Sequence, residues 1–220
     1  MMRFIRKKKD VGIYGFTAKW YDKNTRKSRL SEMHGYADIV SNHVENGGSV
    51  LEVAPGPGYL SIELSKRGYS VTGVEISQDF VDIEKKNAIE FGVDIDFKQG
   101  NASKLPCFDE MFDFVICSAA FKNFKEPVKA LCEMQRVLKP GGKALIIDMN
   151  RALTSADIER EIIKLGMKGF DRWFVKLAFK TFLRQSAYTI DAFEGLIAQT
   201  TFNRHEIKKD GISLFVWLYK

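Results

Sequence analysis

A strand-like run that ends in a turn of very small residues constrains this chain more than any other feature. Residues 49–53 form a short apolar strand pattern with one acidic residue, Glu52, and the turn over residues 54–58 follows at once, before a helical pattern begins. Gly56 and Gly58 in this turn leave room for a ligand to approach the backbone. The order strand, glycine turn, helix is typical of nucleotide-binding proteins and predicts a ligand-binding turn, with a purely structural turn as the alternative.

Short apolar runs alternate with helical patterns through the middle of the chain. This alternation predicts an α/β fold in which helices flank a parallel sheet. The chain has 220 residues, of which 45% are hydrophobic, so we expect a single domain with a substantial core. The expected strands are residues 49–53, 69–74, 93–98, 112–117 and 143–149, and the expected helices are residues 29–44, 59–66, 77–91 and 127–138.

The pattern changes after residue 150. Residues 154–184 are expected to be helical and to form an insertion rather than another strand–helix unit, and a helix capped by Thr189 follows to about residue 199. Residues 204–208 and 213–219 are expected to form a hairpin, because Asp-Gly between strand-like runs favours a tight turn. The large aromatic residues of the insertion are Phe170, Trp173, Phe174, Phe179 and Phe182.

Two polar residues add to the predicted ligand site. Glu75 closes the second expected strand, so its carboxylate should lie beside the glycine turn at the same edge of the sheet. A carboxylate in this place accepts hydrogen bonds from ribose hydroxyls. Asn101 follows the third expected strand, where a short polar side chain reaches an adenine amino group; a plain turn over residues 100–103 is the alternative.

Five motifs together resemble a known family in order and spacing. Residues from about 36 to 149 resemble the small-molecule class I methyltransferases that use S-adenosylmethionine, and most closely the group that includes the enzymes of ubiquinone and menaquinone biosynthesis. The motifs are residues 51–58, 75–77, 100–106, 112–118 and 138–142.

The resemblance implies a doubly wound, Rossmann-like sheet of seven strands, mostly parallel, with an antiparallel hairpin at the C-terminal end. It also implies that S-adenosyl-L-methionine is the cofactor and that a small molecule receives the methyl group. We expect residues 1–28 to cover the cofactor and residues 151–188 to form a helical cap over the substrate. The expected cofactor-binding residues are Tyr14, Tyr21, Glu52, Ala54, Gly56, Gly58, Glu75, Ile76, Asn101, Ala102 and Ser118.

The resemblance also assigns parts of the cofactor to parts of the chain. The turn from Glu52 to Gly58 would lie under the methionine part, whose ammonium group needs carbonyl or carboxylate partners. Ser118 and Ala119, at the end of the fourth strand, would face the sulfonium and the methyl group. Aromatic residues of the N-terminal segment are expected to close over the cofactor, since an aromatic face attracts a cation, with ordinary core packing as the alternative. These residues are Tyr14, Phe16 and Tyr21.

The sequence departs from the family pattern at three places. Ala54 stands where glycine is common, and Asn101 stands where aspartate is common but keeps a side-chain acceptor. Residues 119–124 lack the histidine that many relatives carry after the fourth strand, so the sequence assigns no catalytic residue. The candidates for a general base, each more often structural or exposed, are His34, Glu63, Tyr188 and His205.

Three other functions stay open on the sequence alone. An NAD(P)-dependent oxidoreductase also uses a glycine turn and an acidic residue after the second strand, but Ser61 occupies the third glycine position of the dinucleotide fingerprint. An RNA methyltransferase would suit the net charge of +6, yet no Asn-Pro-Pro-Tyr-like motif follows the fourth strand. A non-catalytic module that only binds the cofactor is the third alternative.

Basic residues gather in two segments. Residues 7–9 and 19–29 hold much of the positive charge, and a solvated N-terminal segment is the expected interpretation. A second basic face within the expected cap could be a solvated outer face, hold an anionic substrate or touch a membrane surface. The aromatic side of the cap favours an apolar or amphipathic acceptor. The basic residues of the cap are Lys168, Arg172, Lys176, Lys180 and Arg184.

The remaining composition points to the cytoplasm. No apolar run approaches the roughly 20 residues of a membrane span, and the basic N-terminal residues lack the apolar stretch of a signal peptide. Cys107, Cys117 and Cys132 are expected to be reduced thiols, and neither they nor the three histidines are spaced as metal ligands, so no metal is expected. The sequence assigns no oligomeric state.

Overall fold

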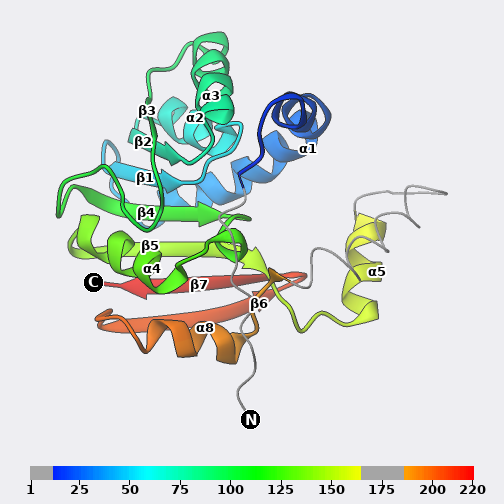
Figure 1. Cartoon of the computed structure of the whole chain (residues 1–220), viewed down its shortest axis with the longest axis vertical. Helices are drawn as coiled ribbons and strands as arrows, with labels where there is room; N and C mark the ends of the chain where they lie inside the picture. The colour runs from blue at the N-terminus through cyan, green and yellow to red at the C-terminus, as the bar shows by residue number, and fades with distance from the viewer. Residues whose placement is uncertain (1–11, 165–185) are drawn as a thin grey trace.

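A seven-stranded sheet organises the chain. The computed structural model describes residues 12–164 and 186–220, and its strands lie in the order β3-β2-β1-β4-β5-β7-β6 (Figure 1). Neighbouring strands from β3 to β5 are parallel, whereas β7 is antiparallel to both β5 and β6. This confirms the predicted sheet. The strands are β1 Ser49–Val53, β2 Ser70–Glu75, β3 Asp96–Gln99, β4 Phe112–Ser118, β5 Leu138–Met149, β6 Arg204–Asp210 and β7 Ser213–Tyr219.

Helices cover both faces of this sheet. Buried residues of α1 and α2 share one apolar cluster with one face, and those of α4 and α8 share another cluster with the opposite face. The described helices are α1 Phe16–Ser41, α2 Tyr59–Lys66, α3 Gln78–Phe91, the 3₁₀ helix η1 Phe121–Asn123, α4 Pro127–Val137, α5 Ser155–Lys164 and α8 Ile190–Ile197.

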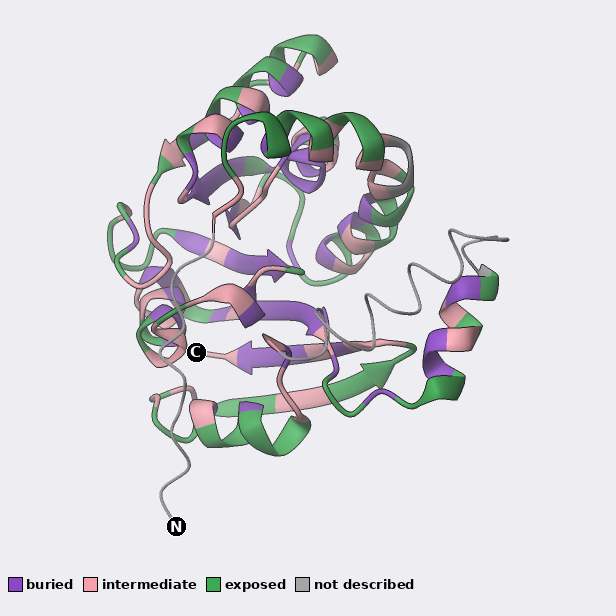
Figure 2. Cartoon of the chain, turned by 45° about the vertical axis from the view of Figure 1, so that its right-hand side comes forward, coloured by how far each residue is buried: buried purple, intermediate pink, exposed green. Residues whose placement is uncertain are grey.

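The central strands are mostly apolar because both of their faces are largely buried. In β4, Phe114 and Ile116 belong to the cluster under α1 and α2, whereas Val115 and Cys117 belong to the cluster under α4 and α8. Such alternation follows from the two-residue period of a strand. The edge strand β6 is largely exposed, while β4 and β5 are buried (Figure 2).

The strand order reverses direction between β1 and β4. From β1 the chain passes to β2 and β3 on one side, and then returns to form β4 and β5 on the other side. The loops after β1 and β4 therefore leave the sheet on opposite sides of one point at its carboxyl edge. In open α/β sheets this point is where ligands bind.

Helix α1 begins thirteen residues before its expected start at residue 29, since it spans Phe16–Ser41. The apolar pattern did not mark its first half because Phe16 and Trp20 face solvent there. Polar contacts hold this half instead: Asp22 accepts hydrogen bonds from the Tyr59 hydroxyl and, at 3.2 Å, from the Asn87 amide.

Two strand boundaries also differ from expectation. β3 starts at Asp96 rather than at residue 93, because Val93 and Ile95 pack against α3 instead of pairing with β2. β5 starts at Leu138 rather than at residue 143, so residues 139–142, which lay between the expected helix and the expected strand, belong to the strand. A register shift between Phe112 and Phe114 accommodates it.

The C-terminal part follows the prediction closely. The Thr189 side chain caps α8 by accepting a hydrogen bond from the Ala192 amide, and β6 and β7 form the expected hairpin, with Gly211 at a φ of +54° in its turn. Helix α5 occupies the first part of the expected helical insertion. The aromatic and basic residues assigned to the cap, from Lys168 to Arg184, lie outside the described residues.

Candidate functional site

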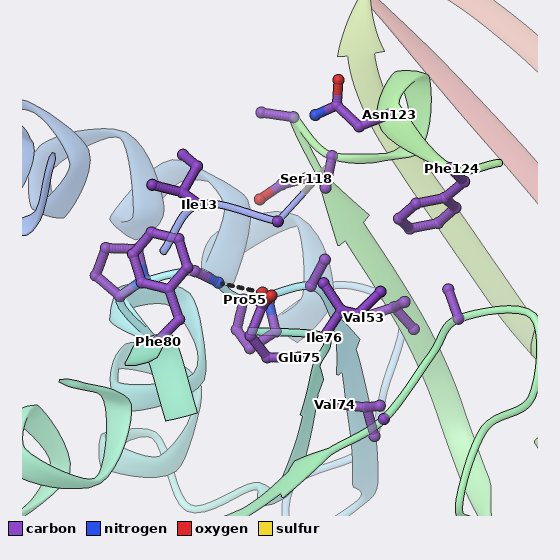
Figure 3. A pocket seen from close by; sticks show the side chains of 18 of the residues that line it. Ile13, Val53, Pro55, Val74, Glu75, Ile76, Phe80, Ser118, Asn123 and Phe124 are labelled. Carbon is purple, nitrogen blue, oxygen red and sulfur yellow. Dashed lines mark hydrogen bonds between the residues drawn. The ribbon is translucent and has the colours of Figure 1, made fainter. Parts of the chain in front are cut away.

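A cavity opens at the carboxyl edge of the sheet, where the strand order reverses. It encloses about 850 Å³, part of which is open to solvent. Phe80 lies on one side of it and Asn123 and Phe124 on the other (Figure 3). Its lining residues are Gly12, Ile13, Tyr21, Arg29, Val53, Ala54, Pro55, Gly56, Pro57, Val74, Glu75, Ile76, Phe80, Gly100, Asn101, Ala102, Ser118, Ala119, Ala120, Asn123 and Phe124.

The turn after β1 forms the floor of this cavity. Gly56 has a φ of +62°, and a Cβ atom added to it would meet no atom within 4 Å, so its bare Cα faces the open space. Gly58 serves a different purpose: it precedes α2, and an added Cβ would lie 3.1 Å from the Phe97 ring. Gly58 is absent from the lining and allows close packing behind the turn.

Glu75 is held in place by backbone amides. Its Oε2 atom accepts a hydrogen bond from the Gly56 amide at 3.3 Å, and its Oε1 atom accepts one from the Ser77 amide at 3.0 Å. Burial raises the pKa of this carboxyl above its ordinary value, while these amides lower it. Each carboxylate oxygen keeps a further lone pair, so Glu75 can accept two more hydrogen bonds from a ligand in the cavity.

Two more glutamates lie buried behind the turn. Glu52 accepts a hydrogen bond from the Ser61 hydroxyl at 2.6 Å, and burial raises its pKa to about 7. Glu84 is fully buried, with no hydrogen-bond partner within the described part of the chain, and burial raises its pKa well above the ordinary value. Neither glutamate lines the cavity.

Asn101 lies in the loop after β3 and lines the cavity. Its Oδ1 atom accepts hydrogen bonds from the amide and hydroxyl of Ser103, at 2.9 and 2.8 Å. Two residues of α4 fix the end of this loop: Glu133 accepts from the Leu105 amide at 2.8 Å, and Arg136 donates to the Leu105 carbonyl at 3.1 Å.

The loop after β4 forms the opposite wall. Ser118, Ala119 and Ala120 lead from the strand into η1, and Ala119 adopts the left-handed region with a φ of +59°. Lys122 stabilises this loop from behind: its ammonium group donates to the Ala119 carbonyl and, at 2.9 Å, to Oδ1 of Asp148. Both charged side chains are almost fully buried.

Residues 12–29 form a strap over the cavity. The Ser77 hydroxyl donates to the Ile13 carbonyl at 2.7 Å, and the Gly15 amide donates to Asp79 at 3.0 Å. Tyr21 packs edge-on against Phe80, with their ring centroids 6.1 Å apart.

The strap places two predicted aromatic residues outside the cavity. Tyr21 and Arg29 line the cavity, with Arg29 also donating to Glu32 at 2.5 Å, whereas Tyr14 and Phe16 are exposed and absent from its lining.

The candidate general bases all lie outside the lining. His34 pairs with Glu63 at 2.9 Å, and Glu63 also accepts from Arg67. His205 lies on the edge strand β6, and Tyr188 packs against Phe121. Within residues 12–164 and 186–220, no group of three His, Cys, Asp or Glu residues could hold a metal ion.

The structure thus brings most of the predicted site residues together. Tyr14, Glu52 and Gly58 are predicted site residues that do not line the cavity. Gly12, Ile13, Arg29, Phe80, Asn123 and Phe124 line it without having been predicted. Gly12 and Ile13 fall in the segment that was expected to cover the cofactor, and the position of Asn123 and Phe124 shortly after β4 carried a further sequence signal. The predicted residues in the lining are Tyr21, Ala54, Gly56, Glu75, Ile76, Asn101, Ala102 and Ser118.

Comparison with known proteins gives a consistent result. Residues 51–146 match the family model described as a methyltransferase domain. A ubiquinone biosynthesis O-methyltransferase of Pseudomonas paraeruginosa is 23% identical over 207 residues, which are 87% of this chain and 87% of the relative. A demethylmenaquinone methyltransferase of Deinococcus radiodurans is 36% identical over 101 residues, 45% of this chain and 42% of the relative.

A solved structure shares the fold over almost the whole chain. It is a proposed S-adenosyl-L-methionine-dependent methyltransferase from Methanococcus maripaludis, with a TM-score of 0.73 and 21% sequence identity. The match covers 96% of this chain and 97% of that one. At this identity the likeness concerns the fold.

Proposed function

Because the chain is a class I S-adenosylmethionine-dependent methyltransferase of the small-molecule type, we propose that it methylates an apolar or amphipathic small molecule in the cavity between β2 and β4. The observation that carries the site assignment is Glu75, whose carboxylate is fixed by the amides of Gly56 and Ser77. Its unused lone pairs suit the two hydroxyl groups of a ribose.

The residues present fit S-adenosylmethionine. The bare Cα of Gly56 leaves room for the ligand against the floor, Glu75 would accept from the ribose hydroxyls, and Asn101 and Ala102 would border the adenine. We call this part of the cavity, residues 54–57, 75–77 and 100–102, the nucleoside side. Arg29 lines the same cavity, and its guanidinium suits the carboxylate of the methionine part.

We call residues 118–124 the acceptor side. Bound cofactor would supply a methyl group on a positively charged sulfur, which keeps the electron pair of the broken carbon–sulfur bond when the methyl group passes to the acceptor. Ser118, Ala119 and Ala120 leave space beside that methyl group because their side chains are small. Phe124 offers an apolar surface to an acceptor, and Asn123 a single amide for hydrogen bonds.

Positioning is the main contribution we assign to the protein. Among the described lining residues, Tyr21, Arg29 and Glu75 are the only ionisable ones, and all three belong to the strap or the nucleoside side. Correct orientation of two reactants can contribute about 7–11 kcal/mol to lowering a barrier. We therefore propose an acceptor atom that is nucleophilic without a protein base on the acceptor side.

Three further parts of the proposal concern how the cofactor and the substrate are covered and where in the cell the chain acts. We propose that residues 1–28 cover the cofactor, that residues 151–188 form the substrate cap and that the chain acts in the cytoplasm. The strap contacts of Ile13 and Tyr21 support the first point. Over the described residues, no helix combines the length and apolar character needed to cross a membrane.

Ligand binding tests this proposal directly. We expect isothermal titration calorimetry to detect binding of S-adenosylhomocysteine and no binding of NADH. Incubation with S-adenosylmethionine and a panel of thiols, amines, phenols and carbon acids should then release S-adenosylhomocysteine with at least one apolar or amphipathic member. Binding of NADH alone would contradict the cofactor assignment, and cofactor binding without turnover on the whole panel would favour a non-catalytic module.

A further inference from the structure

Large aromatic and basic side chains are exposed on the first turns of α1 and just before it. The exposed fractions are 81% for Phe16, 55% for Trp20 and 52% for Tyr14, and Lys19 and Lys23 are exposed beside them. We call these five residues the α1 outer face. Exposed aromatic residues in a group mark an interaction surface more often than single ones do.

The helix holds this face outward. Phe16, Trp20 and Lys23 follow one another at steps of four and three residues, which places them along one side. On the other side Ala18 is fully buried and Asp22 binds Tyr59 and Asn87. Turning the outer face inward would break these contacts, so its exposure follows from how α1 is anchored.

The positive charge of the chain is concentrated in the same stretch of sequence. Residues 1–29 hold ten Lys and Arg against two Asp, whereas the rest of the chain holds 24 Lys and Arg against 26 Asp and Glu. The body is therefore slightly acidic, and the whole positive excess belongs to the segment that carries the outer face. Among the described residues, Lys19 and Lys23 form no ion pair, so both charges are free to meet an anionic partner.

We propose that the α1 outer face docks on an anionic lipid surface. Trp and Tyr favour the boundary between headgroups and acyl chains, and flanking lysines add attraction to anionic lipids. Single-stranded nucleic acid, by contrast, binds along basic grooves with stacking aromatic residues. The outer face is the convex side of a helix, and none of its five residues lines a described cavity.

Docking would place the cavity next to the lipid. The strap lines the cavity through Ile13 and Tyr21, and the outer face alternates with these residues along the same short segment. An acceptor dissolved in the membrane would then reach the acceptor side with a short path through water. This consequence, unlike the docking itself, rests on the proposed function.

Co-sedimentation with vesicles tests the docking. We expect the full chain to sediment with phosphatidylcholine vesicles that contain phosphatidylglycerol and not with pure phosphatidylcholine. Trp20→Ala should weaken binding about tenfold, because it removes buried apolar area, and the double variant Lys19→Glu/Lys23→Glu should weaken it about thirtyfold or more. Higher salt should also weaken it, since exposed charges are screened.

Matched variants elsewhere serve as controls. Phe108 is 85% exposed, and the Lys129 and Lys208 side chains are 67% and 70% exposed. Phe108→Ala and Lys129→Glu/Lys208→Glu should therefore bind vesicles within about twofold of the wild type. S-adenosylhomocysteine affinity should be unchanged in all four variants.

Two results would overturn the docking. One is the absence of binding to anionic vesicles; if single-stranded RNA binds instead and the outer-face variants abolish that binding, the partner is a nucleic acid. The other is an equal loss of vesicle binding in the control variants. Absence of S-adenosylhomocysteine binding in the wild type would instead overturn the proposed function, so failure of the docking and failure of the proposed function are distinguishable.

Discussion

The two sides of the cavity are built on different principles. On the nucleoside side, backbone amides fix Glu75 and an Asx-type turn fixes Asn101, so the polar groups that meet a ligand are held by local hydrogen bonds. On the acceptor side, the lining groups other than Asn123 are small or apolar, and the buried Lys122–Asp148 pair holds the loop from behind. The nucleoside side therefore holds polar groups in place for one particular ligand. The acceptor side holds only its loop in place, so the size of its side chains determines which acceptor fits.

The largest effect should follow from filling the floor of the nucleoside side. We expect Gly56→Val to lower S-adenosylhomocysteine affinity more than about a thousandfold, because the new side chain enters the space that the ligand needs. Gly47→Val is the control: Gly47 also has a positive φ and open surroundings but lies at the other end of the sheet. Calorimetry should find the affinity of Gly47→Val for S-adenosylhomocysteine unchanged. An equal loss of affinity in both variants would show that backbone strain, and not a side chain filling the ligand's space, causes the effect.

Breaking the buried ion pair behind the acceptor side should lower the stability of the protein rather than its affinity for the cofactor. Lys122→Met leaves the Asp148 carboxylate buried without its cation, so we expect the free energy of unfolding to fall by about 3–5 kcal/mol. The half-exposed pair of Lys139 and Asp113 provides the control, since Lys139→Met should cost under about 1 kcal/mol. Urea unfolding measures both, and equal costs would mean that burial does not distinguish the pairs.

Removing the carboxylate of the nucleoside side should weaken cofactor binding strongly. In Glu75→Ala two hydrogen bonds to ribose hydroxyls are lost, at about 1.5 kcal/mol each, so the affinity for S-adenosylhomocysteine should fall about a hundredfold. Glu45→Ala, an exposed glutamate at the far end of the sheet, should bind normally. A normal affinity in Glu75→Ala would show that the site is assigned to the wrong residues.

Stability should depend on pH through Glu52, behind the nucleoside side. Burial raises its pKa from 4.5 to about 7, so the folded chain keeps a proton that the unfolded chain has released. Stability is therefore fully present below pH 4.5 and falls as pH rises to about 7, by on the order of 3 kcal/mol.

The variant Glu52→Gln isolates this contribution. It should match the wild type near pH 4 and be more stable than it at pH 8, because glutamine stays neutral and can still accept from Ser61. Urea unfolding at the two pH values measures the difference. An unchanged pH dependence in Glu52→Gln would assign the effect to Glu84, whose buried carboxyl acts in the same direction.

The smallest effect on cofactor binding should come from the acceptor side. We expect Ala120→Leu to leave S-adenosylhomocysteine affinity within about threefold while it lowers methyl transfer to the acceptor found in the panel at least about tenfold, because the larger side chain takes up acceptor space. If Ala120→Leu reduced the cofactor affinity as much as Glu75→Ala does, the result would contradict the division of the cavity into a nucleoside side and an acceptor side.

Local chemistry determined what the sequence predicted, whereas packing between elements determined what it missed. The strand Ser49–Val53, its turn and the helix cap at Thr189 were predicted closely, because local chemistry determines each of them. Arg29 and Phe80 were missed as lining residues since they come from helices whose orientation is set by packing between elements. The start of α1 was missed because Asp22, rather than an apolar stripe, anchors its first half.

Helix α1 gives the cover of the cavity an unusual mechanical character. It is continuous over 26 residues and so about 39 Å long, and its second half is locked into the core through Met33, Ala37 and Val40. The wall that Tyr21 and Arg29 contribute is therefore part of a continuous helix rather than a loose loop. Admission of a ligand on that side therefore requires either bending this helix or detaching residues 12–15 from the start of α3, to which the Ile13 and Gly15 backbone is hydrogen-bonded.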